Sequence, residues 1–397
     1  MLFPIRKSAS ERPFMTLRRL LLCSAVVILA WHVAPSEAFD RTRSQFERFF
    51  WTFETFNRHI IYDECAIEFA DYRDPTKKDD PAWHKWSVTL LACVLDKVDE
   101  IEKATMAVTG ILFALLPVLM AQVGPSIPEL VFLSTRRPIL AALLGYGSLS
   151  PNPTAAMGFE DLEEVVEKAK KRRNILPNWG FLNDPNFFVM VIISGLEYAI
   201  ALAAAGNCFY QIWRLTYRGI SVAPIVVYVI GIPESATLFG WAALNLPVHV
   251  VGFLSFALAF RHKATSPSRR FFLARWIVNE LTPCVHGTDF TLVERKNLPV
   301  SQALTGALTR ISASLHIISG TVLLGSVYFV VLNDSLPIIY AFVAAGVGTR
   351  LVLEFELIGL AKSLKEEDNK VSQLPSGILE TKSDSSSKTA GVAVNLS

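Results

Sequence analysis

Six ionisable side chains lie inside stretches of the chain that are otherwise apolar, and they are the residues best placed to do chemistry. They are Glu197, His249, His316, Arg350, Glu354 and Glu356. An ionisable group inside a bilayer costs about 2.5–3.5 kcal/mol on insertion scales, so each is expected to have a partner or a water-filled cavity. Such a set could relay protons or ions, or bind a polar ligand. The structural alternative is that the side chains pair and lock the helices together.

Four of these residues are predicted to form an intramembrane polar cluster, namely Glu197, His316, Arg350 and Glu354. Glu197 follows Phe187 by ten residues, about 15 Å along a helix. Arg350 precedes Ala361 by eleven residues on a helix that runs the other way, so Glu197 and Arg350 could meet. Glu354 is four residues beyond Arg350 on the same helix, a spacing that favours an ion pair. His316 would serve a relay because imidazole titrates near neutral pH.

Membrane helices must position these residues. Residues 104–123 contain no charged residue, and twenty helical residues rise about 30 Å, the thickness of the hydrocarbon core. The whole chain is 51% apolar and 19% charged, with a mean hydropathy of +0.37. The sequence therefore predicts an all-α membrane protein with a five-helix transmembrane bundle at 104–361. The predicted spans are 104–123, 187–206, 236–260, 311–332 and 336–361.

The segment 221–260 could hold one span or two, because three prolines interrupt forty mostly apolar residues. Two spans would place 261–310, which contains eight Lys and Arg residues, outside the cytosol. Lys and Arg bias a loop to the cytosolic side, so we predict one span. Residues 221–232 are then expected to form a lumenal half-helix.

The N-terminal residues 1–38 have the pattern of a signal peptide, with a basic start, an apolar core and small residues before a cleavage point after Ala38. An uncleaved anchor is the alternative, and both place residue 39 onward in the lumen or outside the cell. Residues 39–103 are expected to form a small helical hairpin there. Cys65 and Cys93 flank its polar turn and are predicted to pair if the compartment is oxidising; two buried free thiols are the alternative.

The core of this hairpin is expected to form from two apolar stripes at helical spacing. The first stripe is Phe46, Phe49, Phe50, Phe53, Phe56 and Ile60, and the second is Leu91, Val94, Val98 and Ile101.

The loops 124–186 and 261–310 are predicted to be cytosolic from their Lys and Arg content. Residues 129–144 are apolar but too short to span, so one or two interfacial helices are expected there. A basic run either contacts anionic lipid at the cytosolic face or is a solvated helix end; it consists of Lys168, Lys170, Lys171, Arg172 and Arg173. The polar tail 362–397 is predicted to be disordered and cytosolic.

One motif is similar to known sequences. The run Gly124-Pro125-Ser126-Ile127-Pro128-Glu129-Leu130, followed by Leu133-Ser134-Thr135-Arg136-Arg137-Pro138, resembles a signature of uncharacterised multi-pass membrane proteins of filamentous fungi. The similarity covers the first span, the loop after it and the later hydrophobic block. It implies a membrane location, and it brings no activity and no catalytic residues.

Enzyme, metal and nucleic-acid signals are weak in this sequence. It contains no phosphate-binding P-loop, no G-x-S-x-G and no H-E-x-x-H, and its seven histidines include no i, i+4 pair to hold a metal. A net charge of +2 gives no broad basic surface for nucleic acid.

We therefore expect a non-enzymatic scaffold or receptor-like protein of the secretory pathway or plasma membrane. Its expected surroundings are the lipid bilayer, and any protein partner is unknown. We expect no cofactor and no metal. The alternative is a small-solute or proton-linked transporter that uses Glu197 and Arg350.

Overall fold

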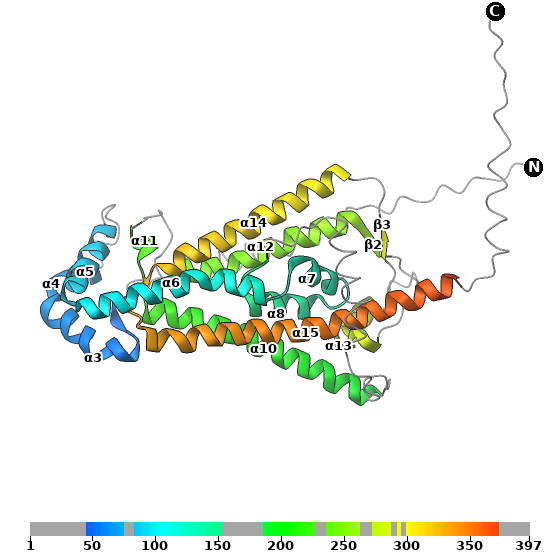
Figure 1. The fold of residues 1–397 in the computed structure, drawn as a ribbon, viewed down its shortest axis with the longest axis horizontal. Coiled ribbons are helices and arrows are strands. Elements are labelled where there is room, and N and C mark those ends of the chain that lie inside the picture. Colours follow the sequence, from blue (N-terminus) through cyan, green and yellow to red (C-terminus); the bar gives the residue numbers. More distant parts are fainter. Residues whose placement is uncertain are drawn as a thin grey trace, which may run out of the picture.

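A computed structural model describes residues 45–74, 83–152, 186–226, 236–262, 272–286, 292–294 and 299–372 of this protein. The predicted signal peptide, the basic run at 168–173 and the tail beyond 372 lie outside these ranges. Within them the chain is almost entirely helical (Figure 1).

Five of the described helices are long and apolar enough to cross a membrane, which confirms the predicted number of spans. They are α6 (Glu100–Val123), α10 (Phe187–Arg218), α12 (Ala236–Ala259), α14 (Pro299–Gly325) and α15 (Leu332–Ser372). Within the described part of 221–260 there is one long helix, α12, in agreement with the prediction of one span for that segment. The fifth helix continues to Ser372, well past the predicted start of the disordered tail at 362.

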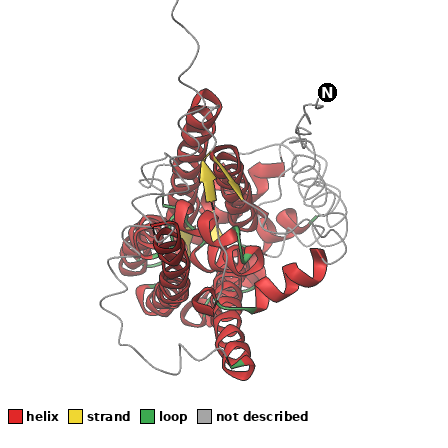
Figure 2. Cartoon of the chain, turned by 90° about the vertical axis from the view of Figure 1, so that its right-hand side faces the viewer, coloured by secondary structure: helices red, strands yellow, loops and turns green. Residues whose placement is uncertain are grey.

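The long helices lie roughly parallel to one another, with α12 packed on α14 and α10 on α15 (Figure 1). Figure 2 views them close to end-on. Their outer faces carry exposed apolar side chains, such as Ile192 at 69%, Leu304 at 70% and Leu351 at 66% exposure. An apolar surface of this extent is typical of lipid contact rather than water contact.

A row of aromatic rings marks one end of the bundle. Tyr210, Trp213 and Tyr217 succeed one another along α10, with ring centroids 6.0 Å and then 5.8 Å apart. Aromatic side chains gather where the hydrocarbon meets the headgroups, so we take this row as the membrane boundary at that end.

The first long helix stops part of the way through the bundle. Val123, the last residue of α6, lies against Gly346 of α15, which is fourteen residues, or about 21 Å, from the start of α15. Two short helices follow, α7 (Ile127–Ser134) and α8 (Pro138–Ser148), which pack against each other. Ser148 at the end of α8 returns to Gly124, so the two helices form a re-entrant hairpin.

This hairpin is buried, so the expectation of interfacial helices at 129–144 was wrong. In α7 the side chains of Leu130, Val131, Phe132 and Leu133 are all at most 3% exposed. Helix α8 packs against α10 and α15, and Gly147 comes so close to α15 that a Cβ there would lie 2.4 Å from Thr349 Cγ2. The hairpin fills the space that α6 leaves by ending early.

A small group of helices, here called the cap (residues 45–98), covers the aromatic end of the bundle. It contains the 3-10 turn η1 (Gln45–Glu47), α3 (Trp51–His59), the π-helical turn η2 (Ile60–Glu64), α4 (Ala66–Arg73) and α5 (Trp83–Lys97). Helices α4 and α5 pack together, and a disulfide joins Cys65 to Cys93, as predicted. Glu68 lies beside this disulfide, which leaves neither sulfur free to bind a metal.

The cap shares its core with the bundle. Phe49 and Phe53 pack edge-on against Phe329, which lies in the short link between α14 and α15. Phe329 is fully buried and has a positive φ of 61°, a conformation that is uncommon for a non-glycine residue. The described side chains of the first predicted stripe are therefore core, although this core is shared with the link; the side chain of Phe56 lies outside the described part. Of the second stripe, Ile101 is 80% exposed.

Two short antiparallel strand pairs, two further helices and a 3-10 turn complete the described chain. Strand β1 (Ile220–Ser221) pairs with β4 (Val327–Tyr328) at the cap end, beside α11 (Val222–Val226). Strand β2 (Phe260–His262) pairs with β3 (Leu292–Glu294) at the other end. Helix α13 (Phe272–Leu281) and the turn η6 (Cys284–His286) lie at that other end too (Figure 1).

Candidate functional site

A buried arginine at the tip of the re-entrant hairpin is the centre of the candidate site. Arg137 precedes Pro138, the first residue of α8, and its backbone is non-helical, as expected for a residue before proline. This break turns the chain between α7 and α8. It also directs the Arg137 side chain into the bundle, where it has no exposed surface.

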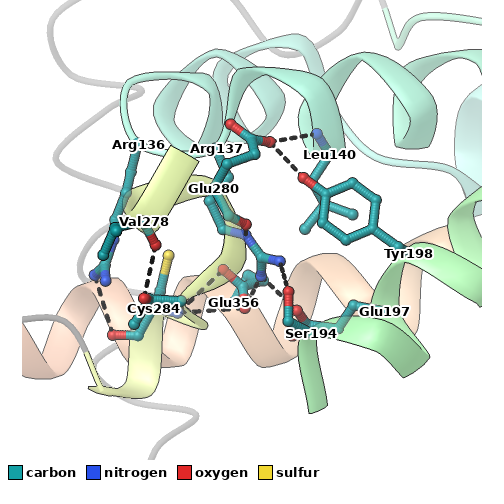
Figure 3. Close-up of polar contacts among 11 residues, drawn as sticks. Arg136, Arg137, Leu140, Ser194, Glu197, Tyr198, Val278, Glu280, Cys284 and Glu356 are labelled. Carbon is teal, nitrogen blue, oxygen red and sulfur yellow. Dashed lines mark hydrogen bonds and ion pairs between the residues drawn. The ribbon is translucent and has the colours of Figure 1, made fainter. Parts of the chain in front are cut away.

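The guanidinium of Arg137 contacts side chains from two long helices. Its Nη1 forms a short ion pair with Glu197 of α10 and lies 2.8 Å from Oε1 of Glu356 of α15. Its Nη2 donates to Ser194 Oγ at 2.8 Å. Figure 3 shows these side chains converging on the arginine. One cation therefore ties the hairpin to both helices.

Helix α13 closes the cluster from the end opposite the cap. Arg137 Nε donates to the carbonyl oxygen of Glu280 at 2.9 Å. The carboxylate of Glu280 accepts from the backbone N–H of Leu140 at 3.0 Å and from the hydroxyl of Tyr198 at 2.6 Å. It thus satisfies one of the free N–H groups at the start of α8, where a negative charge is favourable. The ring of Tyr198 also lies under the guanidinium, 5.4 Å from its carbon.

The turn η6 supplies the last contacts. The backbone N–H of Cys284 approaches both carboxylate oxygens of Glu356 at 3.3 Å, and Arg136 donates weakly to the carbonyl oxygen of Cys284 at 3.5 Å. Burial raises the pKa of the Cys284 thiol well above its usual range, and the nearby carboxylate of Glu356 raises it further. The thiol is therefore neutral at physiological pH.

The cluster contains more carboxylates than cations. The guanidinium of Arg137 stays charged because the carboxylates of Glu197 and Glu356 stabilise its cationic form. Against this charge and that of the partly buried Arg136 stand the carboxylates of Glu197, Glu356 and Glu280. Among the described residues, Oε1 of Glu197 has no hydrogen-bond partner although it is enclosed by protein.

A second ion-pair group lies on the other arm of the hairpin. Arg350 of α15 donates through Nη2 to Oε1 of Glu129 at 3.0 Å, and it also pairs with Glu354 one turn along its own helix. Glu129 in turn accepts from the backbone and hydroxyl of Ser126, which forms a capping box at the start of α7. Arg350 is 27% exposed, so this group is less enclosed than the Arg137 cluster.

The two histidines of the long helices, His316 and His249, lie apart from both groups. His316 of α14 is hydrogen-bonded through Nε2 to the carbonyl oxygen of Leu149 at 2.9 Å, and the ring of Trp241 stacks on it. His249 of α12 lies against Gly145, its Nε2 only 3.1 Å from where a Cβ would be. These contacts join α12 and α14 to the end of α8.

The predicted polar cluster is therefore divided among three places. Glu197 pairs with Arg137, Arg350 pairs with Glu129 and Glu354, and His316 bonds the backbone after α8. The proposed meeting of Glu197 with Arg350 does not occur in the structure. Glu356, which was included among the ionisable residues but not in the cluster, is a direct neighbour of Arg137.

Sequence reasoning missed Arg137, Glu129 and Glu280 because all three lie in segments expected to be outside the bilayer. Local signals pointed to Glu129 and Arg137 but not to Glu280. Ser126 and Glu129 have the spacing of a capping box, and Arg137 stands within an apolar stretch next to a proline.

Searches of protein-family models, of curated proteins and of solved structures found no match to this chain. The resemblance to uncharacterised fungal membrane proteins therefore depends on its motif alone.

Proposed function

We propose that this protein is a non-enzymatic membrane transporter that carries protons, with Glu197 and Glu356 as the pair that binds the proton. The observation that carries the proposal is the enclosed Oε1 of Glu197, which has no partner among the described residues and lies beside a second carboxylate on the same arginine nitrogen. Two carboxylates on one guanidinium leave an excess negative charge in a medium of low dielectric constant. A proton shared by the pair removes that excess.

The enclosure of the site favours a proton over a larger cation. Glu197 is 5% exposed and Glu356 is fully buried, so there is no accessible surface at which a hydrated ion could bind. A proton needs no volume of its own. Its uptake converts one carboxylate of the pair to a carboxylic acid, and its release restores the ion pair with Arg137.

The broken first helix also supports transport. Irregular backbone at membrane depth is tolerated where it is buried in protein or lines a cavity, and broken helices are common at transporter binding sites. Here α6 ends at Val123, and the hairpin that follows carries Arg137 at its tip. A hairpin held by ion pairs can exchange one set of contacts for another when a proton neutralises its partner.

Other titratable groups around the pair would influence its affinity for the proton. The Arg137 guanidinium opposes protonation, whereas the Glu280 carboxylate favours it. Among the residues that the structure describes, Tyr198, Cys284 and Arg136 are the further titratable groups near the pair.

Proton flux into liposomes tests the proposal. Purified protein is reconstituted with a trapped pH-sensitive dye, and a potassium gradient with valinomycin imposes a negative interior. We expect the wild type to acidify the lumen faster than empty liposomes, and we expect Glu197→Gln to abolish the difference. Glu100→Gln is the matched control, because Glu100 is 88% exposed on the first turn of α6.

Each variant must first unfold cooperatively in detergent, and Glu356→Gln replaces Glu197→Gln if the latter does not fold. Wild-type protein that carries no protons, or a folded Glu197→Gln variant that carries them normally, would contradict the proposal.

A second candidate function is that of a scaffold or receptor. The cap displays large apolar side chains that nothing in the described structure covers, with Trp51 88% exposed, Ile67 77% and Tyr62 51%. A photo-crosslinking amino acid at position 51 should then give one discrete adduct in cells, and the same amino acid at position 100 should give none.

We further propose that the cap is lumenal or extracellular and the C-terminus cytosolic, in the secretory pathway or plasma membrane. The Cys65–Cys93 disulfide supports this sidedness because disulfides persist in oxidising compartments. The Lys168–Arg173 run would then face anionic lipid on the cytosolic leaflet. Reporter fusions at residues 150, 215, 290 and 390 test the orientation directly.

A further inference from the structure

Helix α13 has one apolar face that no described residue covers. Ile277, Val278 and Leu281 are 48%, 60% and 53% exposed, and their spacing places them on one side of the helix. Asn279 next to them is also exposed. Glu280 lies beside this face, three residues from Ile277, and is buried against α8 and α10.

The height of this helix in the bundle can be derived from two contacts. Asn207 of α10 donates to the carbonyl oxygen of Ala341 of α15 at 2.6 Å, so these two residues lie at the same height in the bundle. Tyr210, the first ring of the aromatic row, follows Asn207 by three residues along α10. Gly359 of α15 lies against Cys284 and Val285, directly after α13. From Ala341 to Gly359 is eighteen residues, or about 27 Å.

The three residues from Asn207 to Tyr210 add a few ångströms to this distance. The end of α13 is therefore about 30 Å from the aromatic row, and this distance equals the thickness of the hydrocarbon core. The apolar face of α13 is therefore level with the second membrane boundary. An apolar face at that depth continues the lipid-contacting surface of the long helices.

We propose that α13 is an in-plane membrane-surface helix at the boundary opposite the cap, with Ile277, Val278 and Leu281 inserted among phospholipid acyl chains. An amphipathic helix in this position gains its binding energy from apolar area buried at the headgroup boundary. The partner is the lipid surface itself, rather than a protein or a second copy of the chain.

This placement gives α13 a direct link to the buried cluster. Its Glu280 holds the start of α8 through Leu140 and holds Arg137 through the backbone carbonyl. The lipid surface thus supports the helix that closes the cluster. The inference does not depend on proton transport, since it follows from depth and exposure alone.

Site-directed spin labelling in liposomes tests the depth of each face. A nitroxide is attached to Val278→Cys, to Asn279→Cys as the neighbouring polar control and to Glu100→Cys as the control in water. The parent chain is labelled in parallel to correct for native cysteines, of which Cys208 and Cys284 are buried. Ile277→Cys and Leu281→Cys replace the first variant if it fails to fold.

We expect the ratio of oxygen to nickel-chelate collisions at Val278 to be several-fold higher than at Asn279 and Glu100, because oxygen concentrates in lipid and the chelate stays in water. A ratio at Val278 equal to that at Glu100 would place the face in water. Protection from both reagents, with dipolar broadening between labels, would show that a second copy covers it. Either result would overturn the inference.

Discussion

The guanidinium of Arg137 lies 2.8 Å from the carboxylate of Glu356, and neither side chain has any exposed surface. The two residues belong to the hairpin tip and to the last long helix, and only the tertiary structure brings them together. Removing one member of a buried ion pair leaves the other charged and unpaired, so this contact should dominate the response to mutation.

Arg137→Met should destabilise the protein strongly, whereas Arg136→Met should not. Loss of one partner of a buried pair costs about 3–5 kcal/mol, while a partly exposed arginine with a single long hydrogen bond contributes under about 1 kcal/mol. Unfolding in detergent with increasing denaturant measures both free energies. Equal losses for the two neighbouring substitutions would show that the buried pair does not lock the hairpin.

Gly147→Ala should loosen the contact of the hairpin with α15, because its new Cβ would lie 2.4 Å from Thr349 Cγ2 and 2.9 Å from Ala204 Cβ. Overpacking of a tight contact costs about 1–3 kcal/mol. Gly206→Ala is the control, since nothing lies within 4 Å of its Cβ position. That control should be neutral or stabilising by up to about 1 kcal/mol, through the better helix propensity of alanine.

Thermal unfolding in one detergent compares the two glycine variants. If Gly147→Ala is as stable as Gly206→Ala, the close approach of α8 to α15 is not present in solution.

Cys93→Ser should destabilise the cap without disturbing the bundle. The disulfide closes a loop with a sequence separation of 28, for which the loss of chain entropy predicts roughly 3–4 kcal/mol. Hydrogen exchange should speed up at residues 45–98 and stay unchanged in α12 and α15. Uniform acceleration over the whole chain would instead show that the cap and the bundle unfold together.

The thiol of Cys284 should resist maleimide at neutral pH and remain slow as the pH rises to 9. Its raised pKa keeps it protonated over this interval, whereas an unfolded cysteine ionises near pH 8.5. The same difference makes folding less favourable above about pH 8.5, because only the unfolded chain then loses the proton.

A cysteine introduced at position 100 provides the reference, because its labelling should accelerate over the same pH interval. Labelling of Cys284 at the reference rate before unfolding would mean that the turn η6 opens readily. Mass spectrometry of the labelled peptides distinguishes the two thiols.

The long helices could be predicted because their signal is local. Residues 104–123 are apolar throughout, and a run of that length satisfies its backbone only as a helix in lipid. The Cys65–Cys93 disulfide could also be predicted from the sequence, since both cysteines flank one turn. The position in the bundle at which α6 ends could not be predicted, because an apolar run does not show that Val123 lies beside Gly346 of α15.

The candidate site depended on that unseen feature. Residues 129–144 are too short to span, so sequence reasoning placed them at the surface, although the space beside α6 admits them as a hairpin. The sequence correctly indicated that Glu197 and Arg350 need partners, because a charge inside a bilayer is unfavourable. Each of them pairs with a residue of this hairpin, and they do not pair with each other. The local sequence pattern indicates which ionisable groups need partners, but it does not indicate which residues those partners are.

By itself, the sequence determined where the long apolar helices lie and which of their side chains are too polar to face lipid. Hydropathy and helical periodicity are properties of neighbouring residues over a few helical turns, so the sequence shows them directly. The tertiary structure alone decided that Arg137 meets Glu197, Glu280 and Glu356, since these four residues lie far apart along the chain. Their convergence follows from how the helices pack, because a buried charge is stable only where the packing brings it an opposite charge and hydrogen-bond donors or acceptors.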